Sequence, residues 1–451
     1  MNAKSIMAGI ALPLLAASTG AMAQDAAAAA AVVVEKGDVA WMMLSTLLVI
    51  MMAIPGLALF YGGLVRTKNM LSVLMQVMVV FSLIAVLWAA YGYSLAFGGE
   101  GLFIADFSKA FLLGVTSDSL ADTFTDNVKI PEYIFIAFQA TFAGITCALI
   151  VGSFAERMKF AAVLAFCVLW FTFAYLPIAH MVWGSGGYLL DKGALDFAGG
   201  TVVHINAGVA GLVGAYVLGP RLGYGREAMA PHSLTLTMVG AALLWVGWFG
   251  FNAGSQGGAS GAAGMTMLVT HISAATAALV WCLVERIQTG KTGVVGIATG
   301  MVAGLATITP ASGNVGPMGA LLIGLLAGVI CYFMCGVVRH KLNIDDSLDV
   351  FAVHGVGGIL GTIMVAFLGA EGVLGGLGLS ENPETGETYS SIEQLIVQLK
   401  SLGITIVWSA VATIIIVLII KKTVGLRVSE EVEAEGLDSA EHGETAYNFD
   451  A

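Results

Sequence analysis

The sequence predicts an all-α membrane protein whose chain crosses the bilayer eleven times. Of its 451 residues, 58% are hydrophobic and only 11% are charged, whereas a typical soluble domain is about one-quarter charged. Many apolar runs exceed the length of about 20 residues that a helix needs to cross the hydrocarbon core. The sequence also lacks the alternating ten-residue segments that are typical of a transmembrane β-barrel.

The first 23 residues are predicted to be a signal peptide. Lys4 precedes a short apolar segment, and the small residues Ala21 and Ala23 follow it, so we expect cleavage after Ala23. A first transmembrane helix is the alternative, but the apolar run is short and ends in "AMA". The mature chain would then start outside the membrane with a short segment, residues 24–38.

Hydrophobic runs and the polar breaks between them place a transmembrane domain at residues 39–420 and a tail at 421–451. The expected spans are 39–64, 70–97, 132–155, 160–184, 200–219, 233–254, 260–284, 293–310, 316–338, 349–369 and 394–420.

Basic residues predict the orientation of these spans. With the N-terminus outside, 13 Lys and Arg residues fall in inner segments and five in outer segments, which agrees with the positive-inside rule. We therefore expect the N-terminus outside and the C-terminus inside. An outer loop at 98–131 is acidic, and neither it nor segment 370–393 carries a motif with an assignable role.

The odd number of spans permits an inverted repeat of five helices followed by five more, with a substrate site near the midplane. The fifth span carries Asp196 and then His204, and the tenth carries Asp349 and then His354. Each half would therefore contribute one histidine from an equivalent helix.

The two histidines are candidate pathway residues, because ionisable side chains at membrane depth usually face a bundle interior or a pathway. Asp196 and Asp349 lie too far along their helices to pair with His204 and His354, so we expect the aspartates to anchor helix N-termini. If the two helices meet, the imidazoles could touch and share a proton. Buried histidines that only bond to the backbone are the alternative.

The other histidines suggest no pathway. His180 and His271 also fall within spans, and we expect them to have hydrogen-bonded structural roles. No Cys, Asp or Glu cluster at metal-ligand spacing accompanies the His204 and His354 pair, and the sequence has no basic patch or nucleic-acid-binding module.

Aromatic residues gather at the predicted outer ends of the spans. They include Phe142 in "FQATF", Trp183 in "HMVW", and Trp248 and Phe251 in "WFGFNAGS", which ends at Ser255. Such residues could form an interfacial belt. Alternatively, their ring faces and the Ser255 hydroxyl could bind a cation.

Long motifs throughout the chain resemble those of the ammonium transporter (Amt/Mep/Rh) family, in its bacterial Amt branch. The resemblance covers nearly the whole mature chain and rests on "PGLALFYGGLVRTKNML", "AFQATFAGIT", "ALIVGSFAERMKF", "YLPIAHMVWG", "GALDFAGGTVVHINAG", "GWFGFNAGS", "DDSLDVFAVHGVGGILGT" and "TVGLRVSEEVEAEGLDSAEHGETAYN".

The resemblance implies a transporter rather than an enzyme, with no cofactor. It implies an eleven-helix protomer in the bacterial inner membrane, assembled as a homotrimer with one pore per subunit. Ammonium, or ammonia, would be the substrate, and methylammonium an analogue. It further implies that the tail packs under the subunits and contacts a PII-type signalling protein, although an acidic tail alone is typical of a disordered segment.

The resemblance also assigns roles to individual residues. It implies an external ammonium site at Trp183, Phe142 and Ser255, with Asp196 tied to this site. Phe142 and Phe251 would be stacked gates.

Below the gates, His204 and His354 would be the paired pore histidines, and Trp248 would also line the pore. Two other functions stay open. One is an ammonium sensor that signals with little flux. The other is a gas channel, against which Trp183 and Ser255 favour a recruited cation.

Overall fold

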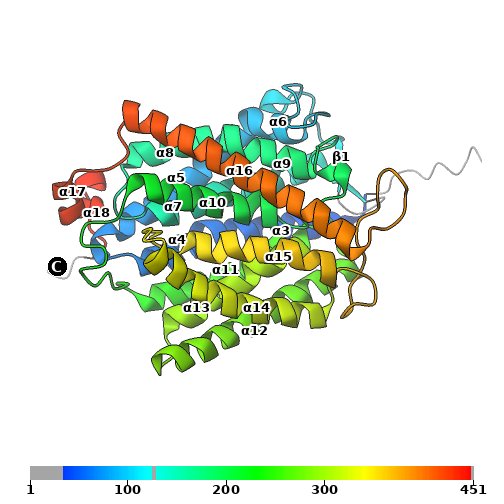
Figure 1. Ribbon diagram of the computed structural model, residues 1–451. Helices are drawn as coiled ribbons and strands as arrows, with labels where there is room; N and C mark the ends of the chain where they lie inside the picture. The colour runs from blue at the N-terminus through cyan, green and yellow to red at the C-terminus, as the bar shows by residue number, and fades with distance from the viewer. Residues whose placement is uncertain (1–33, 124–127, 448–451) are drawn as a thin grey trace, which may run out of the picture.

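The computed structural model describes residues 34–123 and 128–447. It is a bundle of long helices that run roughly in one direction, joined by connections at both ends (Figure 1). The predicted signal peptide, residues 1–23, and most of the segment 24–38 lie outside the described residues.

Eleven helical segments in the described part of the chain are long and apolar enough to cross a membrane, which confirms the predicted number. They are Lys36–Leu64, Thr67–Phe97, Glu132–Phe154, Phe160–Trp183, Gly200–Leu218, Leu234–Gly254, Gly261–Thr289, Val294–Ala311, Pro317–Lys341, Phe351–Leu368 and Ser391–Thr423. Every predicted boundary lies within five residues of the observed one.

Several spans consist of more than one helical element. The first contains α3 (Lys36–Met51), η1 (Met52–Leu57) and α4 (Ala58–Leu64), the second contains η2 (Thr67–Asn69), α5 (Met70–Leu87), η3 (Trp88–Gly92) and α6 (Tyr93–Phe97), and the third is α7 (Glu132–Phe154). The fourth contains α8 (Phe160–Trp170), η5 (Phe171–Tyr175) and α9 (Leu176–Trp183), and the fifth contains η7 (Gly200–Ile205) and α10 (Asn206–Leu218).

The sixth and seventh spans are α11 (Leu234–Gly254) and α12 (Gly261–Thr289), and the eighth contains α13 (Val294–Ile308) and η8 (Thr309–Ala311). The ninth contains α14 (Pro317–Gly336) and η9 (Val337–Lys341), the tenth contains η10 (Phe351–Gly355) and α15 (Val356–Leu368), and the eleventh is α16 (Ser391–Thr423). The fifth and tenth spans share one feature, because both begin with a π-helical turn that carries the histidine.

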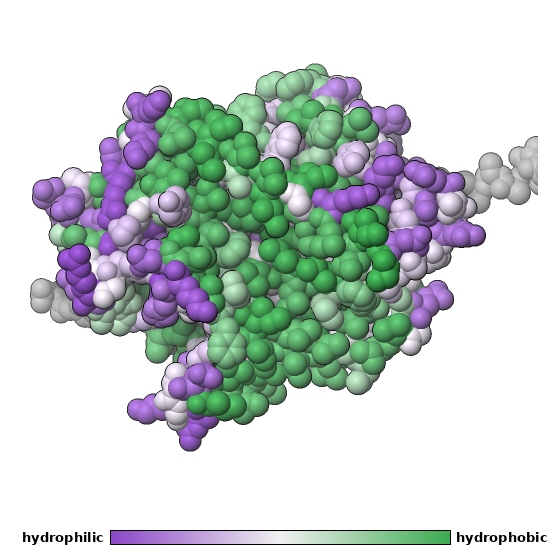
Figure 2. Space-filling model, viewed as in Figure 1, coloured by the Kyte–Doolittle hydropathy of each residue, from purple (hydrophilic) through white to green (hydrophobic). Residues whose placement is uncertain are grey.

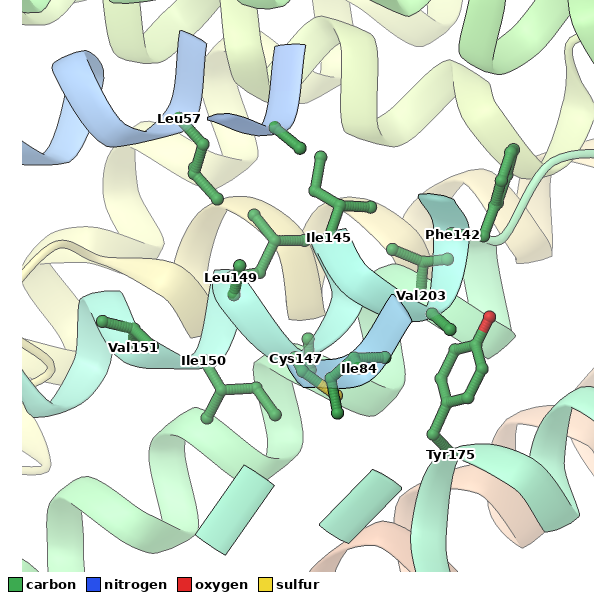
Figure 3. Close-up of a cluster of buried hydrophobic side chains, with 14 of the residues drawn as sticks. Leu57, Ile84, Phe142, Ile145, Cys147, Leu149, Ile150, Val151, Tyr175 and Val203 are labelled. Atoms are coloured by element: carbon green, nitrogen blue, oxygen red, sulfur yellow. The ribbon is translucent and has the colours of Figure 1, made fainter. Parts of the chain in front are cut away.

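The surface matches a membrane setting. Figure 2 shows a broad apolar region between two hydrophilic ends, and α16 crosses this region diagonally in Figure 1. Burial is greatest around α7, where every residue from Thr141 to Phe154 is buried. Figure 3 shows Ile145, Leu149 and Val151 of this helix among side chains of the neighbouring spans.

The connections at the two ends differ in structure. The loop after α6 contains a small antiparallel sheet, β1 (Leu120–Asp122) and β2 (Lys129–Pro131), in which Ala121 pairs with Ile130. The other end holds the C-terminal helices α17 (Glu430–Glu435) and α18 (Leu437–His442), which lie beside the ends of the membrane helices (Figure 1).

Two carboxylates bind the acidic tail to the bundle. Glu433 accepts a hydrogen bond from the Leu222 amide at 2.6 Å, and Arg427 Nη2, within the tail itself, donates to the same carboxylate at 2.6 Å. Asp438 accepts from the amides of Leu71 and Ser72 at 3.0 and 2.8 Å, in the first turn of α5. A carboxylate is favoured there because the first amides of a helix have no partner within it. The tail is therefore ordered despite its charge.

A buried ion-pair network crosses the same end of the bundle. Arg66 lies 2.6 Å and Arg221 3.5 Å from the Glu156 carboxylate, and Arg221 also lies 2.8 Å from Asp345. Burial alone would raise the pKa of Glu156, but Arg221 and Arg66 hold it below its usual value. The network connects loops that are far apart in sequence.

Candidate functional site

His204 and His354 meet at the centre of the bundle. Their Nδ1 atoms lie 3.2 Å apart, their ring centroids lie 5.2 Å apart and their planes differ by 26°. The two residues are only 1% and 3% exposed. The structure therefore brings together the two membrane histidines that the sequence suggested as a pair.

The contact restricts how the two rings are protonated. One Nδ1 atom must donate and the other must accept, because a single hydrogen bond joins them. When both rings are neutral, the donor ring carries a bare Nε2 and the acceptor ring carries an Nε2–H. Within the described residues, the buried Nε2 atom of His204 has no hydrogen-bond partner. The neutral pair thus presents one acceptor and one donor. If a proton arrives at the bare Nε2 of one ring, the shared proton can move to the other ring, which then releases its own Nε2 proton, and the donor and acceptor rings exchange.

Asp196 fixes the start of the helix that carries His204. Its carboxylate accepts hydrogen bonds from the amides of Gly199, Gly200, Thr201 and Val202, three of them at 2.9–3.0 Å, and also from the Thr201 hydroxyl. These are the amides that a helix start leaves without partners. The expected anchoring role of Asp196 is confirmed.

The corresponding expectation for Asp349 is wrong. The Asp349 carboxylate pairs with Arg339 at 2.9 Å, and the residue has a φ of 56°. Asp346 anchors the helix instead, because its carboxylate accepts from the Phe351 amide at 2.7 Å and from the Ser153 hydroxyl at 2.7 Å. Sequence spacing could have identified Asp346, which precedes His354 by eight residues, just as Asp196 precedes His204.

Glycines allow the two histidine helices to approach closely. A Cβ atom on Gly208 of α10 would lie 2.5 Å from the Cα atom of Gly355, which is too close for two carbon atoms. The absence of a side chain on Gly208 therefore lets the two helix backbones touch.

The aromatic residues that the sequence suggested as part of a site lie on one side of the histidine pair. The rings of Phe142 and Phe251 are stacked, with centroids 4.2 Å apart, and the Trp183 ring meets Phe142 edge-on at 5.9 Å. The ring centroids of Phe251 and Trp248 lie 6.0 Å and 5.5 Å from that of His204. None of these four side chains faces the surface, which excludes an interfacial belt.

Polar contacts hold this cluster in place. Trp183 Nε1 donates to the backbone carbonyl of Asp196 at 2.8 Å, and Trp248 Nε1 donates to Thr309 Oγ1 at 2.9 Å. The Ser255 hydroxyl donates to the Phe251 carbonyl at 2.8 Å, just after the end of α11. Ser255 is thus next to Phe251. Sequence reasoning did not suggest Thr309.

A chain of cavities passes the histidines. The cavity that they line has a volume of about 10 Å³, near the lower limit for one water molecule. A cavity of about 250 Å³ continues from His354 towards Arg339 and Asp349, and one of about 410 Å³ shares Arg339 with it. Burial raises the pKa of Asp349, while Arg339 acts against this rise. On the aromatic side, Trp183 and Asp196 line a separate cavity of about 850 Å³.

The other two histidines in spans differ from each other. Both ring nitrogens of buried His180 face backbone carbonyls, those of Ala96 and Gly101, at 2.8 and 2.6 Å, as expected for a structural role. His271 is instead exposed on α12 against the rings of Trp245 and Phe249. Among residues 34–123 and 128–447, no group of three or more His, Cys, Asp or Glu residues could hold a metal ion.

Comparison with known proteins gives consistent matches. A family model described as Ammonium Transporter Family matches residues 40–447. The "Ammonium transporter" of Aquifex aeolicus is 44% identical over 419 residues, which cover 92% of this chain and 94% of that protein.

Solved structures share the fold over a similar length. A structure named "Sensor Amt Protein" has a TM-score of 0.81 at 28% identity and covers 90% of this chain and 98% of its own. Mep2 of Candida albicans has a TM-score of 0.79 at 33% identity and covers 88% and 87% of the two chains.

Proposed function

Because the chain belongs to the ammonium transporter family, we propose that it recruits ammonium, deprotonates it, and conducts ammonia past paired histidines across a bacterial inner membrane. The observation that carries this proposal is the contact between His204 and His354 in a narrow cavity behind two stacked phenyl rings.

Recruitment would use the aromatic cluster. An ammonium ion is attracted to the faces of aromatic rings, and Trp183 lies against Phe142, which is also one of the two gate rings. The Ser255 hydroxyl has oxygen lone pairs that can accept a hydrogen bond from the ion. Asp196 supports this site through its carbonyl contact with the Trp183 indole.

Exclusion of potassium follows from the gates. Phe142 and Phe251 are stacked and buried, so a bare cation would have to lose its hydration shell among apolar rings. Ammonium can release a proton and continue as neutral ammonia, whereas potassium has no proton to release. Size alone would discriminate poorly between the two ions.

The histidine pair would conduct the separated proton. Its Nδ1–Nδ1 contact joins the two rings. A proton taken up from ammonium at the bare Nε2 of one ring would move the shared proton to the other ring, which would release its own Nε2 proton. On this scheme ammonia passes along the rings while the proton moves through them. Net transport of charge would then accompany uptake.

We further propose the assembly that the family suggests, a homotrimer with the N-terminus outside and the C-terminus inside. An inverted repeat is supported by the matched spacing of Asp196 to His204 and of Asp346 to His354. The tail would be the regulatory segment, coupling the pore to a PII-type protein. Glu433 contacts the connection after α10, and Asp438 contacts the first turn of α5.

Electrical recording from proteoliposomes tests the transport proposal. An ammonium gradient should evoke a current that equal potassium does not, and methylammonium should evoke one as an analogue. Changing His204→Ala together with His354→Ala should abolish selective current. His271→Ala provides a matched control, because this membrane histidine is exposed on the bundle surface.

The same recording separates two other functions. A gas channel would change internal pH without current. A sensor, favoured by the structural likeness to a protein named as one, would give neither response. Either result, obtained with protein that is shown to be folded in the proteoliposomes, would contradict the proposed transport.

A further inference from the structure

A long groove on the membrane-facing side of α16 lies apart from the cavities that the paired histidines line. Its volume is about 1010 Å³, and it runs between α16 and the α8–η5 segment from Lys400 to Ile419. In Figure 2 this side of the molecule is largely apolar. From the geometry and charge of this groove, we propose that it is a binding site for an anionic phospholipid whose phosphate is held by Lys400.

The groove has the length of the bilayer interior. Lys421 follows Lys400 by 21 residues on the same helix, which is about 31 Å along the axis. The hydrocarbon core of a bilayer is about 30 Å thick. The two lysines thus bracket the apolar part of α16, and the part of the groove next to Lys400 faces the acyl chains of one leaflet, which fills about half of this thickness.

One end of the groove is suited to a headgroup. Lys400 is exposed, and none of the ion pairs found among the described residues involves it. Tyr188 lines the same groove beyond the end of α9, where aromatic residues commonly mark the membrane interface. Phe103 stacks on Tyr188 at 6.3 Å and extends the apolar surface. An unpaired ammonium group above an apolar groove complements a lipid phosphate.

The floor of the groove is left open by a glycine. Gly403 lies in the middle of α16, and a Cβ atom there would meet no atom within 4 Å. Glycine is unfavourable within a helix by about 1 kcal/mol relative to alanine. The space above Gly403 lies between Lys400 and the half-exposed Trp408 ring. An acyl chain that enters below the headgroup would fill it.

Native mass spectrometry of the intact detergent-purified assembly tests the site. Phosphatidylglycerol and phosphatidylcholine with the same acyl chains are titrated separately. One phosphatidylglycerol per chain should bind about fivefold more tightly than phosphatidylcholine, the contribution of one lysine near an anionic surface. Lys400→Gln should remove this preference. Lys36→Gln should keep it, because Lys36 is an exposed lysine at the same end of another span.

Filling the groove provides an independent test. Gly403→Leu should weaken the binding of both lipids, because the added side chain extends into the open space, where a Cβ atom would meet no protein atom within 4 Å. Equal affinities for the two lipids in the wild type would overturn the proposal, as would an unchanged preference in Lys400→Gln. Unchanged binding in Gly403→Leu would do the same. A change in the mass of the assembly in Gly403→Leu, with lipid binding retained, would show that a second copy occupies the groove.

Discussion

The Asp196 carboxylate is predicted to be a major source of stability for the histidine-bearing end of the fifth span. In Asp196→Ala, four backbone amides and the Thr201 hydroxyl would lose their acceptor. Asp196 is only 7% exposed, so water can replace few of these bonds. An unsatisfied buried donor costs about 1–3 kcal/mol, and the four amides alone at the lower end of this range correspond to about 4 kcal/mol.

The isosteric variant makes the expectation sharper. In Asp196→Asn, one oxygen can still accept from two amides, while the new NH₂ group opposes the donors at the other position. We therefore expect a loss of roughly half the alanine effect, about 2 kcal/mol. The asparagine side chain has nearly the same volume, so packing would be retained.

The assay is thermal unfolding of purified protein in detergent, read together with ammonium-evoked current. The Tm should fall in the order wild type, Asp196→Asn, Asp196→Ala. Asp191→Ala serves as the matched control, since Asp191 is an exposed aspartate in the same connection. Equal Tm values for Asp196→Ala and Asp191→Ala would refute the reasoning that the carboxylate holds the helix start.

Three further predictions concern packing, pH and the tail. Gly208→Ala should lower the Tm, because the new methyl group overlaps Gly355 and such overpacking costs about 1–3 kcal/mol; Gly403→Ala, in open space, should not, and equal effects would contradict the close contact. The lowered pKa of Glu156 means that its stabilising contribution is complete above its ordinary pKa and is lost as the pH falls through the folded-state value. Tm should therefore fall on acidification, and Glu156→Gln should flatten that dependence; parallel curves would argue against the network. Asp438→Ala should release the tail from α5, at a cost of about 0.5–2 kcal/mol, and make it more sensitive to limited proteolysis than the exposed control Glu444→Ala; equal cleavage rates would contradict the capping role.

The span boundaries were predictable because they depend mainly on composition. Apolar length and polar breaks define a membrane helix almost independently of its neighbours, and so the observed ends lie close to the predicted ones. The π-helical turns at Gly200–Ile205 and Phe351–Gly355 were not predicted. They depend on how each helix start is held by its aspartate and on how the neighbouring spans pack.

Those parts of the site that depend on the sequence of a single helix could be predicted. His204 and Asp196 were identified from a polar residue within an apolar run. The aromatic residues could not be assigned from sequence alone, because interfacial and buried rings have the same composition. Only the packing of α7, α9 and α11 shows that Phe142, Trp183 and Phe251 are buried together.

The tenth span shows how a nearby residue of the same type can mislead. Asp349 lies closer to His354 in sequence, but its positive φ and its ion pair with Arg339 turn it away from the helix start. Asp346 lies three residues earlier and anchors that start. The choice between the two depends on Arg339, which belongs to the preceding span and has no signal in the local sequence.

The central claim, that the His204–His354 pair moves a proton separately from ammonia, is tested most directly by one paired measurement. Current and internal pH are recorded together in proteoliposomes that contain the His204→Ala and His354→Ala double variant. The account predicts loss of the selective ammonium current, with any remaining current carried by potassium as well. A double variant that keeps both the ammonium current and the exclusion of potassium would contradict it.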